Sequence, residues 1–512
     1  MPQFLTFQDV SFSYDSLSGD LFTGLTLTLP AAWAGIVGPN GSGKTTILRL
    51  AAGELTPRQG RIDRPGRVVY CAQRTDDPPT MLAEFLSSDT PLARELRGRL
   101  DVREDYLQRW ATLSHGERKR AQIAVALWQE PAVLAVDEPS NHIDADARDL
   151  LIQRLAEYTG VGLLVSHDRR MLDGLCRTCL FVDPPLAVLR PGNYTSAFAQ
   201  QQMDLEHLRT QREKAGWQVH RLKPEMIQRR QTASREHKIR SKRGLAPKDH
   251  DAKGKIDAAR VCDSKAGASL RQLQGRMEQA SQKLAALVVK KESQTGIFLP
   301  HCRSRRDFLF QLPAGSIDLA AGQPQRAEAS RTLQFPDLSM RPTDRVALTG
   351  PNGAGKSTLI RYILQHLNLP PERVLYMPQE IPIGQAADIL NEARRLRHEK
   401  LGWVMNIISR PGSAPQRVLQ TDQPSPGEVR KLLLALGIAS EAHLIVMDEP
   451  TNHLDLPSIQ CLEEALLPCP CGLLMVSHDL VFLQKLAQVR WDIRPDPQCP
   501  RRAQLQTYPG WQ

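Results

Sequence analysis

The chain has 512 residues, of which 41% are hydrophobic and 24% are charged, and its formal net charge is +10. A single core seldom grows to this length, so two domains and a connecting segment are expected. No apolar run reaches the roughly 18 residues that a membrane-spanning helix needs, and the nine cysteines are too scattered for a disulfide framework. These features argue against a membrane protein and a disulfide-rich protein, and they predict a cytoplasmic one.

The first motif follows a predicted strand, AGIVG at 34–38, and leads into a helical pattern at 46–53. It satisfies GxxxxGK[ST], in which glycines let backbone N–H groups surround phosphates at a helix N-terminus. Lys44 is expected to reach the β- and γ-phosphates of ATP, and the Thr45 hydroxyl is expected to bind Mg²⁺. The predicted ATP-binding residues of this loop are Gly38, Pro39, Asn40, Gly41, Ser42, Gly43, Lys44, Thr45 and Thr46.

Three further apolar stretches of this half end in polar residues, at Gln73, at Asp137 and Glu138, and at His167. Short buried strands that alternate with helices predict an α/β fold with a mainly parallel P-loop sheet, whose strand ends lie beside the phosphate loop. Asp137 suits the Mg²⁺ shell, and Glu138 is placed to polarise the attacking water as general base. We expect His167 to contact the γ-phosphate and Gln73 to sense Mg²⁺ or the water. Structural or surface roles are the alternatives for these two.

The basic character of the chain lies in the segment 209–306, which holds 25 Lys and Arg against 9 Asp and Glu, whereas the rest is net acidic. Apolar residues with the spacing of a coiled-coil seam flank its basic centre at 228–255 and predict an antiparallel helical hairpin with a basic tip. The stronger seam is Leu270, Leu273, Met277, Ala280, Leu284 and Leu287. The weaker one is Leu205, Leu208, Ala215, Val219, Leu222 and Met226.

A charge run of this kind can be a solvated face or a disordered linker. We favour nucleic-acid contact, because a basic tip on a helical arm can replace the counterions of a phosphate backbone. The predicted contact residues are Arg229, Arg230, Arg235, Lys238, Arg240, Lys242, Arg243 and Lys248.

The second half repeats the motifs of the first. A GPNGAGKST loop recurs at 350–358, and apolar stretches again end in Gln379, in Asp448 and Glu449, and in His478. The two loop lysines are 312 residues apart. Each acidic residue of the first half lies 311 residues before its counterpart in the second half, and so does the histidine. This nearly constant offset predicts a duplicated domain whose residues have the same roles. The second set of ATP-binding residues is Gly350, Pro351, Asn352, Gly353, Ala354, Gly355, Lys356, Ser357 and Thr358, and the Mg²⁺ candidates are Ser357, Asp448 and Gln379. Domains are predicted at 1–200, 201–295 and 296–512.

Two cysteine pairs stand outside these motifs. Cys176 and Cys179 form a CxxC pair, and Cys469 and Cys471 form a CxC pair. Neither has a matching second pair of ligands, so buried free thiols are expected in preference to a metal site.

In each half, the phosphate loop, the glutamine, the acidic pair and the histidine follow one another in the order of the Walker A, Q-loop, Walker B and H-loop of ABC ATPases, which they resemble. SNHID at 140–144 and TNHLD at 451–455 resemble the D-loops of that family. LSHGE at 113–117 and PSPGE at 424–428 stand in the place of the ABC signature. In that family each signature caps the ATP of the opposite cassette, so the resemblance implies intramolecular pairing in a monomer. It assigns Ser425, Gly427 and Glu428 to the first site, and Ser114, Gly116 and Glu117 to the second.

Two residues depart from the usual signature. His115 replaces a glycine, and Pro426 replaces another and also lacks a backbone N–H. We therefore expect the first composite site to be slower or structural. Tyr14 resembles the aromatic residue that stacks on adenine, although a core position would suit it as well; the second half offers no assigned counterpart.

Tandem cassettes, the absence of a membrane domain and a charged helical linker together resemble the ABC-F proteins. The resemblance implies ATP and Mg²⁺ as cofactors, ATP hydrolysis, and a linker that inserts into the ribosome near the peptidyl-transferase region and the P-site tRNA. A translation factor and an antibiotic-resistance protein would share these motifs, so this choice stays open. A DNA-repair or chromosome-associated ABC ATPase is the main alternative, and the motor subunit of an ABC transporter is less favoured.

Overall fold

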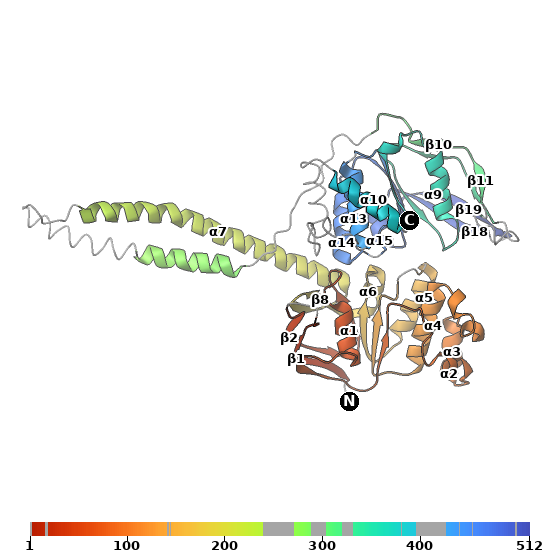
Figure 1. Cartoon of the computed structure of the whole chain (residues 1–512), viewed down its shortest axis with the longest axis horizontal. Coiled ribbons are helices and arrows are strands. Elements are labelled where there is room, and N and C mark those ends of the chain that lie inside the picture. The colour runs from red at the N-terminus through yellow and green to blue at the C-terminus, as the bar shows by residue number, and fades with distance from the viewer. Residues whose placement is uncertain are drawn as a thin grey trace, which may run out of the picture. The chain divides into compact units, whose positions relative to one another are not determined.

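The computed structural model describes residues 3–15, 19–140, 143, 145–238, 271–287, 304–319, 331–379, 381–395, 426–439, 441–452, 454–496 and 499–511. The chain divides into two compact units. Unit 1 comprises Met1–Ala197 together with Ser293–Gln512, and unit 2 is Phe198–Glu292. Below, the first cassette is the part of unit 1 up to Ala197, and the second cassette is its C-terminal part (Figure 1).

A six-stranded sheet with the order β5-β6-β7-β3-β8-β9 forms the centre of the first cassette. Its first five strands are parallel, and the last is antiparallel to its neighbour. The strands are β3 (Trp33–Val37), β5 (Val68–Cys71), β6 (Val133–Asp137), β7 (Val161–Val165), β8 (Cys176–Asp183) and β9 (Leu186–Pro191). Every residue of β3, β6 and β7 is buried, as expected for strands that are covered on both faces.

A three-stranded antiparallel sheet with the order β2-β1-β4 packs beside this core. Its strands are β1 (Phe4–Phe12), β2 (Phe22–Pro30) and β4 (Gln59–Asp63). Phe7 and Phe22 of this sheet share one buried apolar cluster with Ile47 of helix α1. The helices are α1 (Lys44–Ala52), α2 (Leu82–Ser87), α3 (Pro91–Arg99), α4 (His115–Trp128), α5 (Ala145–Ala156) and α6 (Arg169–Leu175), with 3-10 turns at Glu104–Tyr106 and Trp110–Thr112.

The second cassette repeats this architecture. Its eight-stranded sheet has the order β11-β12-β19-β18-β14-β17-β16-β15. The neighbouring strands β15, β16, β17, β14 and β18 are parallel, like β5, β6, β7, β3 and β8 of the first cassette. The strands are β11 (Gly315–Asp318), β12 (Thr332–Phe335), β14 (Arg345–Thr349), β15 (Val374–Met377), β16 (Leu444–Asp448), β17 (Gly472–Val476), β18 (Val489–Asp496) and β19 (Cys499–Pro509). A separate pair is formed by β10 (Phe310–Leu312) and β13 (Leu338–Met340). The helices are α9 (Lys356–Gln365), α10 (Ile383–Arg394), α13 (Pro426–Ala439), α14 (Leu456–Leu466) and α15 (Leu480–Leu486), with a 3-10 turn at Pro371–Arg373.

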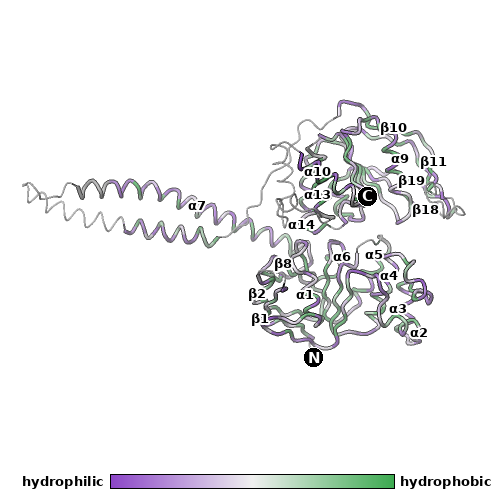
Figure 2. Tube along the Cα trace, viewed as in Figure 1, coloured by the Kyte–Doolittle hydropathy of each residue, from purple (hydrophilic) through white to green (hydrophobic). Residues whose placement is uncertain are grey.

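Unit 2 is helical. Helix α7 (Tyr194–Lys238) runs through it, and residues 271–286 form a second helix. Val219, Leu222 and Met226 of α7 pack in one apolar cluster with Leu273 and Ala280, so the two predicted seams meet (Figure 1). The predicted α/β fold with a helical linker is therefore confirmed. Figure 2 shows that apolar residues gather in the central strands of both cassettes, whereas α7 is mixed. Within the described residues, none of the helices combines the length and apolar character needed to span a bilayer.

Candidate functional site

Both phosphate loops share one backbone geometry. Gly43 and Gly355 stand directly before α1 and α9 with φ of 89° and 101°, a region that favours glycine. A Cβ at Gly43 would lie 2.7 Å from the Phe22 ring, and one at Gly355 would lie 2.5 Å from Leu319. Glycine is thus required on both conformational and steric grounds. The resulting turn leads into a helix N-terminus, where free N–H groups and the helix dipole favour an anion.

The loop lysines lie folded over their own loops. Lys44 Nζ donates to the carbonyl oxygens of Gly38 and Pro39, each at 2.9 Å. Lys356 makes the same two contacts in the second loop, at 2.7 and 3.0 Å. Burial lowers the pKa of Lys44, although nearby carboxylates favour its charged form. Each loop therefore holds a cation at the position where triphosphate oxygens are expected.

Asp137, at the end of β6, faces the first loop. Thr45 Oγ1 donates to its Oδ2 at 2.8 Å, and the Tyr70 hydroxyl does so at 3.2 Å. Its other oxygen, Oδ1, is buried and has no hydrogen-bond partner among the described residues. A hydroxyl and a carboxylate oxygen with spare acceptor capacity fit Mg²⁺, which prefers hard oxygen ligands. In the second cassette Ser357 likewise hydrogen-bonds to Asp448.

The two glutamates lie just beyond the strands, in a backbone conformation that we did not predict. Glu138 and Glu449 have φ of 44° and 52°, which is uncommon for residues other than glycine. Each backbone N–H donates to the neighbouring strand, to Val165 O at 2.9 Å and to Val476 O at 2.8 Å. This turn directs the chain away from the sheet directly after the aspartate. No local sequence pattern signals it.

Each glutamate is paired with the predicted histidine of its own cassette. The His167 N–H donates to Glu138 Oε2 at 3.3 Å, and the ring Nε2 lies 3.1 Å from Glu138 Oε1. For His478 and Glu449 the corresponding distances are 3.2 and 3.4 Å. His478 Nε2 also lies 3.1 Å from Asn352 Oδ1 of the phosphate loop. The structure thus brings acid, histidine and loop together at one edge of each sheet.

Burial makes both glutamates weaker acids than a free carboxyl group. Burial raises the pKa of Glu138 to about 8 and that of Glu449 to about 7, although the neighbouring lysine opposes both shifts. Burial, followed by the charge of Lys44, lowers the pKa of His167 to about 3. A carboxyl group whose pKa lies near the working pH is suited to exchange a proton with water.

The comparisons with known proteins agree with this geometry. The ABC transporter family model matches residues 22–141 and again 333–452. The chain is 29% identical to the ribosome protection protein VmlR of Bacillus subtilis (strain 168), over 88% of this chain and 80% of that protein. It is 27% identical to the ATP-binding cassette sub-family F member 2 of Bos taurus, over 74% of this chain and 57% of that protein. The chain belongs to the ABC-F family. Because its cassettes are ABC domains, this ABC-F protein is an ATP-binding ATPase.

Among solved structures, the RNase-L Inhibitor has a similar fold. The TM-score is 0.62, with 17% sequence identity over 97% of this chain and 90% of that one. At this identity the likeness concerns the fold alone.

The first signature of this ABC-F protein forms a helix cap that sequence reasoning missed. Ser114 is the N-cap of α4: its Oγ accepts from Glu117 N at 3.3 Å, and its own N–H donates to Glu117 Oε2 at 2.8 Å. The Ser-x-x-Glu spacing before a helix is the signal that would have predicted this capping box. In the second signature Pro426 is the first residue of α13, where a missing N–H does not disturb the helix. Ser425 lies outside the described residues.

The structure also places Gln73, Gln379 and Tyr14. Both glutamine side chains are exposed beyond the ends of β5 and β15. The Tyr14 hydroxyl is 3.0 Å from Thr46 Oγ1, and its ring packs edge-on against Phe12. Their roles at ATP remain predictions.

A D-loop residue for which the sequence suggested no role joins the two cassettes. The Asn40 N–H of the first phosphate loop donates to Asp455 Oδ2 at 2.6 Å. Asp455 also caps α14 by accepting from Ser458 N at 2.9 Å. Within unit 1, a phosphate loop is therefore tied to the helix that follows the opposite Walker B strand.

Half of the eight predicted nucleic-acid contact residues lie in the described part of the chain. Arg229 and Arg230 lie on α7, and Arg229 pairs with Glu225 at 2.8 Å. The backbone positions of Arg235 and Lys238 are on the same helix. The remaining four, Arg240, Lys242, Arg243 and Lys248, lie outside the described residues.

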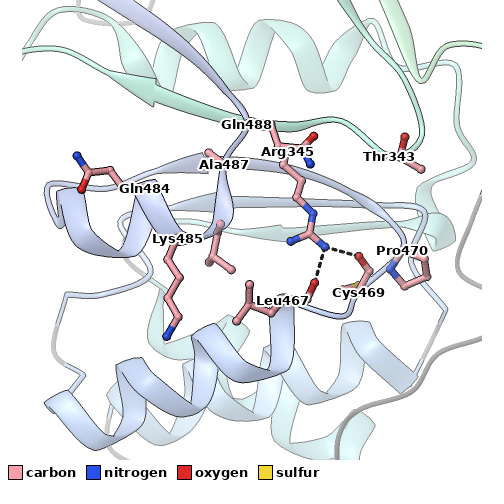
Figure 3. Close-up of a pocket in the computed structure, with 10 residues that line it drawn as sticks. Thr343, Arg345, Leu467, Cys469, Pro470, Gln484, Lys485, Ala487 and Gln488 are labelled. Carbon is pink, nitrogen blue, oxygen red and sulfur yellow. Dashed lines mark hydrogen bonds between the residues drawn. The ribbon is translucent and has the colours of Figure 1, made fainter. Parts of the chain in front are cut away.

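The second cassette also contains a cavity of about 590 Å³ (Figure 3). Arg345 and Cys469, which line it, stand at the amino ends of β14 and β17, whereas the ATP motifs follow the carboxyl ends. Arg345 donates to the carbonyl oxygens of Leu467 and Cys469 at 2.9 and 2.6 Å. The Cys469 and Cys471 sulfurs are 2.9 Å apart. Among the described residues, no group of three metal-ligating side chains occurs there or elsewhere.

Proposed function

We propose that this ABC-F protein hydrolyses ATP with Mg²⁺ at two sites and acts on the ribosome through its basic helical linker. One observation carries the proposal: in each cassette a phosphate loop, an aspartate with a hydroxyl partner, and a buried glutamate paired with a half-buried histidine lie together at one edge of the sheet. Thr45 with Asp137, and Ser357 with Asp448, would hold the metal. In their ionised form, Glu138 and Glu449 would accept the proton of the attacking water.

The ribosome as target is supported by relatives whose names give that role, such as the ribosome protection protein from B. subtilis. It is also supported by the charge of the linker, since rRNA and tRNA are polyanions. We propose a cytoplasmic monomer whose cassettes pair within one chain, with domains at 1–200, 201–295 and 296–512. ATP binding by Ser114, Gly116, Glu117, Ser425, Gly427 and Glu428 across the pairing is part of this proposal.

A hydrolysis-deficient variant tests the proposal. Glu138→Gln combined with Glu449→Gln should retain ATP and hold the cassettes closed, because the amide keeps the shape but cannot take the proton. With ATP this variant should sediment with ribosomes in a sucrose gradient, and without ATP it should stay near the top. Failure to reach the ribosomal fractions, with retention on DNA, would replace the ribosome with DNA as the target. The two single variants measured separately show whether the first site turns over more slowly.

A further inference from the structure

A buried lysine lies on α4, the helix that begins in the first signature. It contacts backbone carbonyl groups beside the predicted catalytic residues of the first cassette. Lys119, on α4, is 3% exposed. Its Nζ donates to Ala72 O at 2.7 Å and to Gln73 O at 3.3 Å, both in the Q-loop. It also donates to Asp137 O at 3.3 Å, at the end of the Walker B strand. One ammonium group therefore bridges three segments that are distant in sequence: the signature helix, the Q-loop and the Walker B strand.

The second cassette has a cation at the same position. Arg430, on α13, is 3% exposed and lies 311 residues after its counterpart, the offset of the Walker B and H-loop pairs. Its guanidinium donates to Glu449 O at 3.2 Å and to the carbonyl oxygens of Gln379 and Asn452. The residue type differs between the cassettes, but the Q-loop glutamine and the acidic pair supply carbonyl acceptors in both.

A buried cation is costly unless its hydrogen bonds are satisfied, so a role in packing alone would be served better by an apolar residue. Within the described part of the chain, these two cations instead donate to backbone or side-chain amide oxygens, most of which lie beside the predicted catalytic groups.

We propose that Lys119 and Arg430 are positioning residues that couple each signature helix to the Q-loop and Walker B acids of its own cassette. The inference deepens the proposed ATPase function and rests on it. Each cation lies five residues after its signature serine, Ser114 or Ser425. If each signature caps the opposite ATP, capping at one site would shift a helix that holds the catalytic backbone of the other. Each ATP site would thereby affect the geometry of the other, through Lys119 in one direction and Arg430 in the other.

The test uses Lys119→Met, which keeps the length of the stem but removes the charge, and Lys119→Arg, which installs the residue of the second cassette. Both are made in full-length protein carrying Glu449→Gln, so that turnover reports the first site. The matched control is Arg120→Met, because Arg120 is the next residue on the helix and pairs with the exposed Asp101 at 3.5 Å instead.

We expect Lys119→Met to lower kcat about 10- to 100-fold, the size of effect that a small misplacement of catalytic groups produces. The Kd for a fluorescent ATP analogue should change less than about threefold, because the phosphate loop is untouched. Lys119→Arg should restore most of kcat, and Arg120→Met should leave it unchanged. An unaltered kcat in Lys119→Met, or parallel losses of kcat, ATP binding and Tm, would overturn the proposal.

Hydrogen exchange of the nucleotide-free protein gives a readout that needs no turnover. In Lys119→Met, peptides covering 71–76 and 136–139 should exchange at least several-fold faster, while those of β3 should not change. Unchanged exchange in both peptides would refute the coupling even if the wild-type chain proved unable to hydrolyse ATP. An inactive wild-type chain with the predicted change in exchange would refute only the proposed ATPase function.

Discussion

Replacing the buried glutamates with glutamine should stabilise the nucleotide-free protein, and the gain should grow with pH. A carboxyl group whose pKa is higher in the folded than in the unfolded chain keeps its proton longer in the fold. Folding stability then falls as pH rises from the unfolded pKa through the folded one. For Glu138 this window runs from the ordinary 4.5 to about 8, and for Glu449 it runs to about 7.

The magnitude follows from the same pKa values. At pH 7.5, ionisation of the unfolded chain lowers the free energy of unfolding by up to about 4 kcal/mol for Glu138 and about 3 kcal/mol for Glu449. When the buried glutamate ionises, water entry and the approach of the loop lysine offset part of this free-energy cost. We therefore expect each variant to gain about 2 kcal/mol in the free energy of unfolding. For cassettes of this size, that corresponds to a Tm increase of about 4–8 °C. At pH 5 the same substitutions should change Tm by less than about 2 °C.

The assay is thermal unfolding of nucleotide-free Glu138→Gln and Glu449→Gln in EDTA, at pH 5, 6.5 and 8. Glu372→Gln, at an exposed position in a 3-10 turn of the second cassette, is the control for the substitution itself. Glutamine keeps an oxygen that can accept from the histidine N–H, so the comparison isolates the charge. A Tm difference that is the same at all three pH values would show that burial does not raise these pKa values.

Three further outcomes are expected. Neutralising Arg240, Lys242 and Arg243 should weaken polyanion binding and flatten its salt dependence, as titrations at several salt concentrations would reveal, while leaving basal ATPase intact; an unchanged slope would exclude the tip as the contact. Cys469 lines the cavity of the second cassette, and its hydrogen bond with Cys471 lowers its pKa to about 7, whereas burial raises the pKa of Cys176. Brief alkylation at pH 7.5 followed by peptide mass spectrometry should therefore label Cys469 at least about tenfold faster than Cys176, and equal labelling would contradict this. Tyr14→Leu should weaken ATP binding at the first site severalfold if the ring stacks on adenine, as equilibrium binding in a Lys356→Ala background would measure; unchanged affinity would leave Tyr14 a core residue.

The sequence predicts those features that depend on residue type at fixed spacing. Two phosphate loops, two acidic strand ends and two histidines at nearly equal offsets were enough to infer a duplicated α/β domain, because strands that alternate with helices predict a mainly parallel sheet. The apolar spacing around Leu222 and Leu273 was likewise enough to infer paired helices.

Features that depend on long-range backbone contacts could not be predicted. Lys119 was one cation among many on a basic chain, and only the folded backbone shows that it meets carbonyl groups from residues 72 and 137. The contact of Asp455 with Asn40 joins residues 415 positions apart, and no periodicity encodes it. The cap formed by Ser114, by contrast, is signalled locally by its spacing to Glu117.

The left-handed backbone at Glu138 and Glu449 has a consequence for how such cassettes diverge. Glycine at either position would relieve roughly 1 kcal/mol of steric strain, yet it would remove the carboxyl group on which hydrolysis depends. Selection for turnover and selection for a robust fold therefore pull in opposite directions at one residue of each cassette. In relatives in which one of the two sites binds ATP without hydrolysing it, glycine should replace the glutamate at the position of Glu138 or Glu449 before other site residues change.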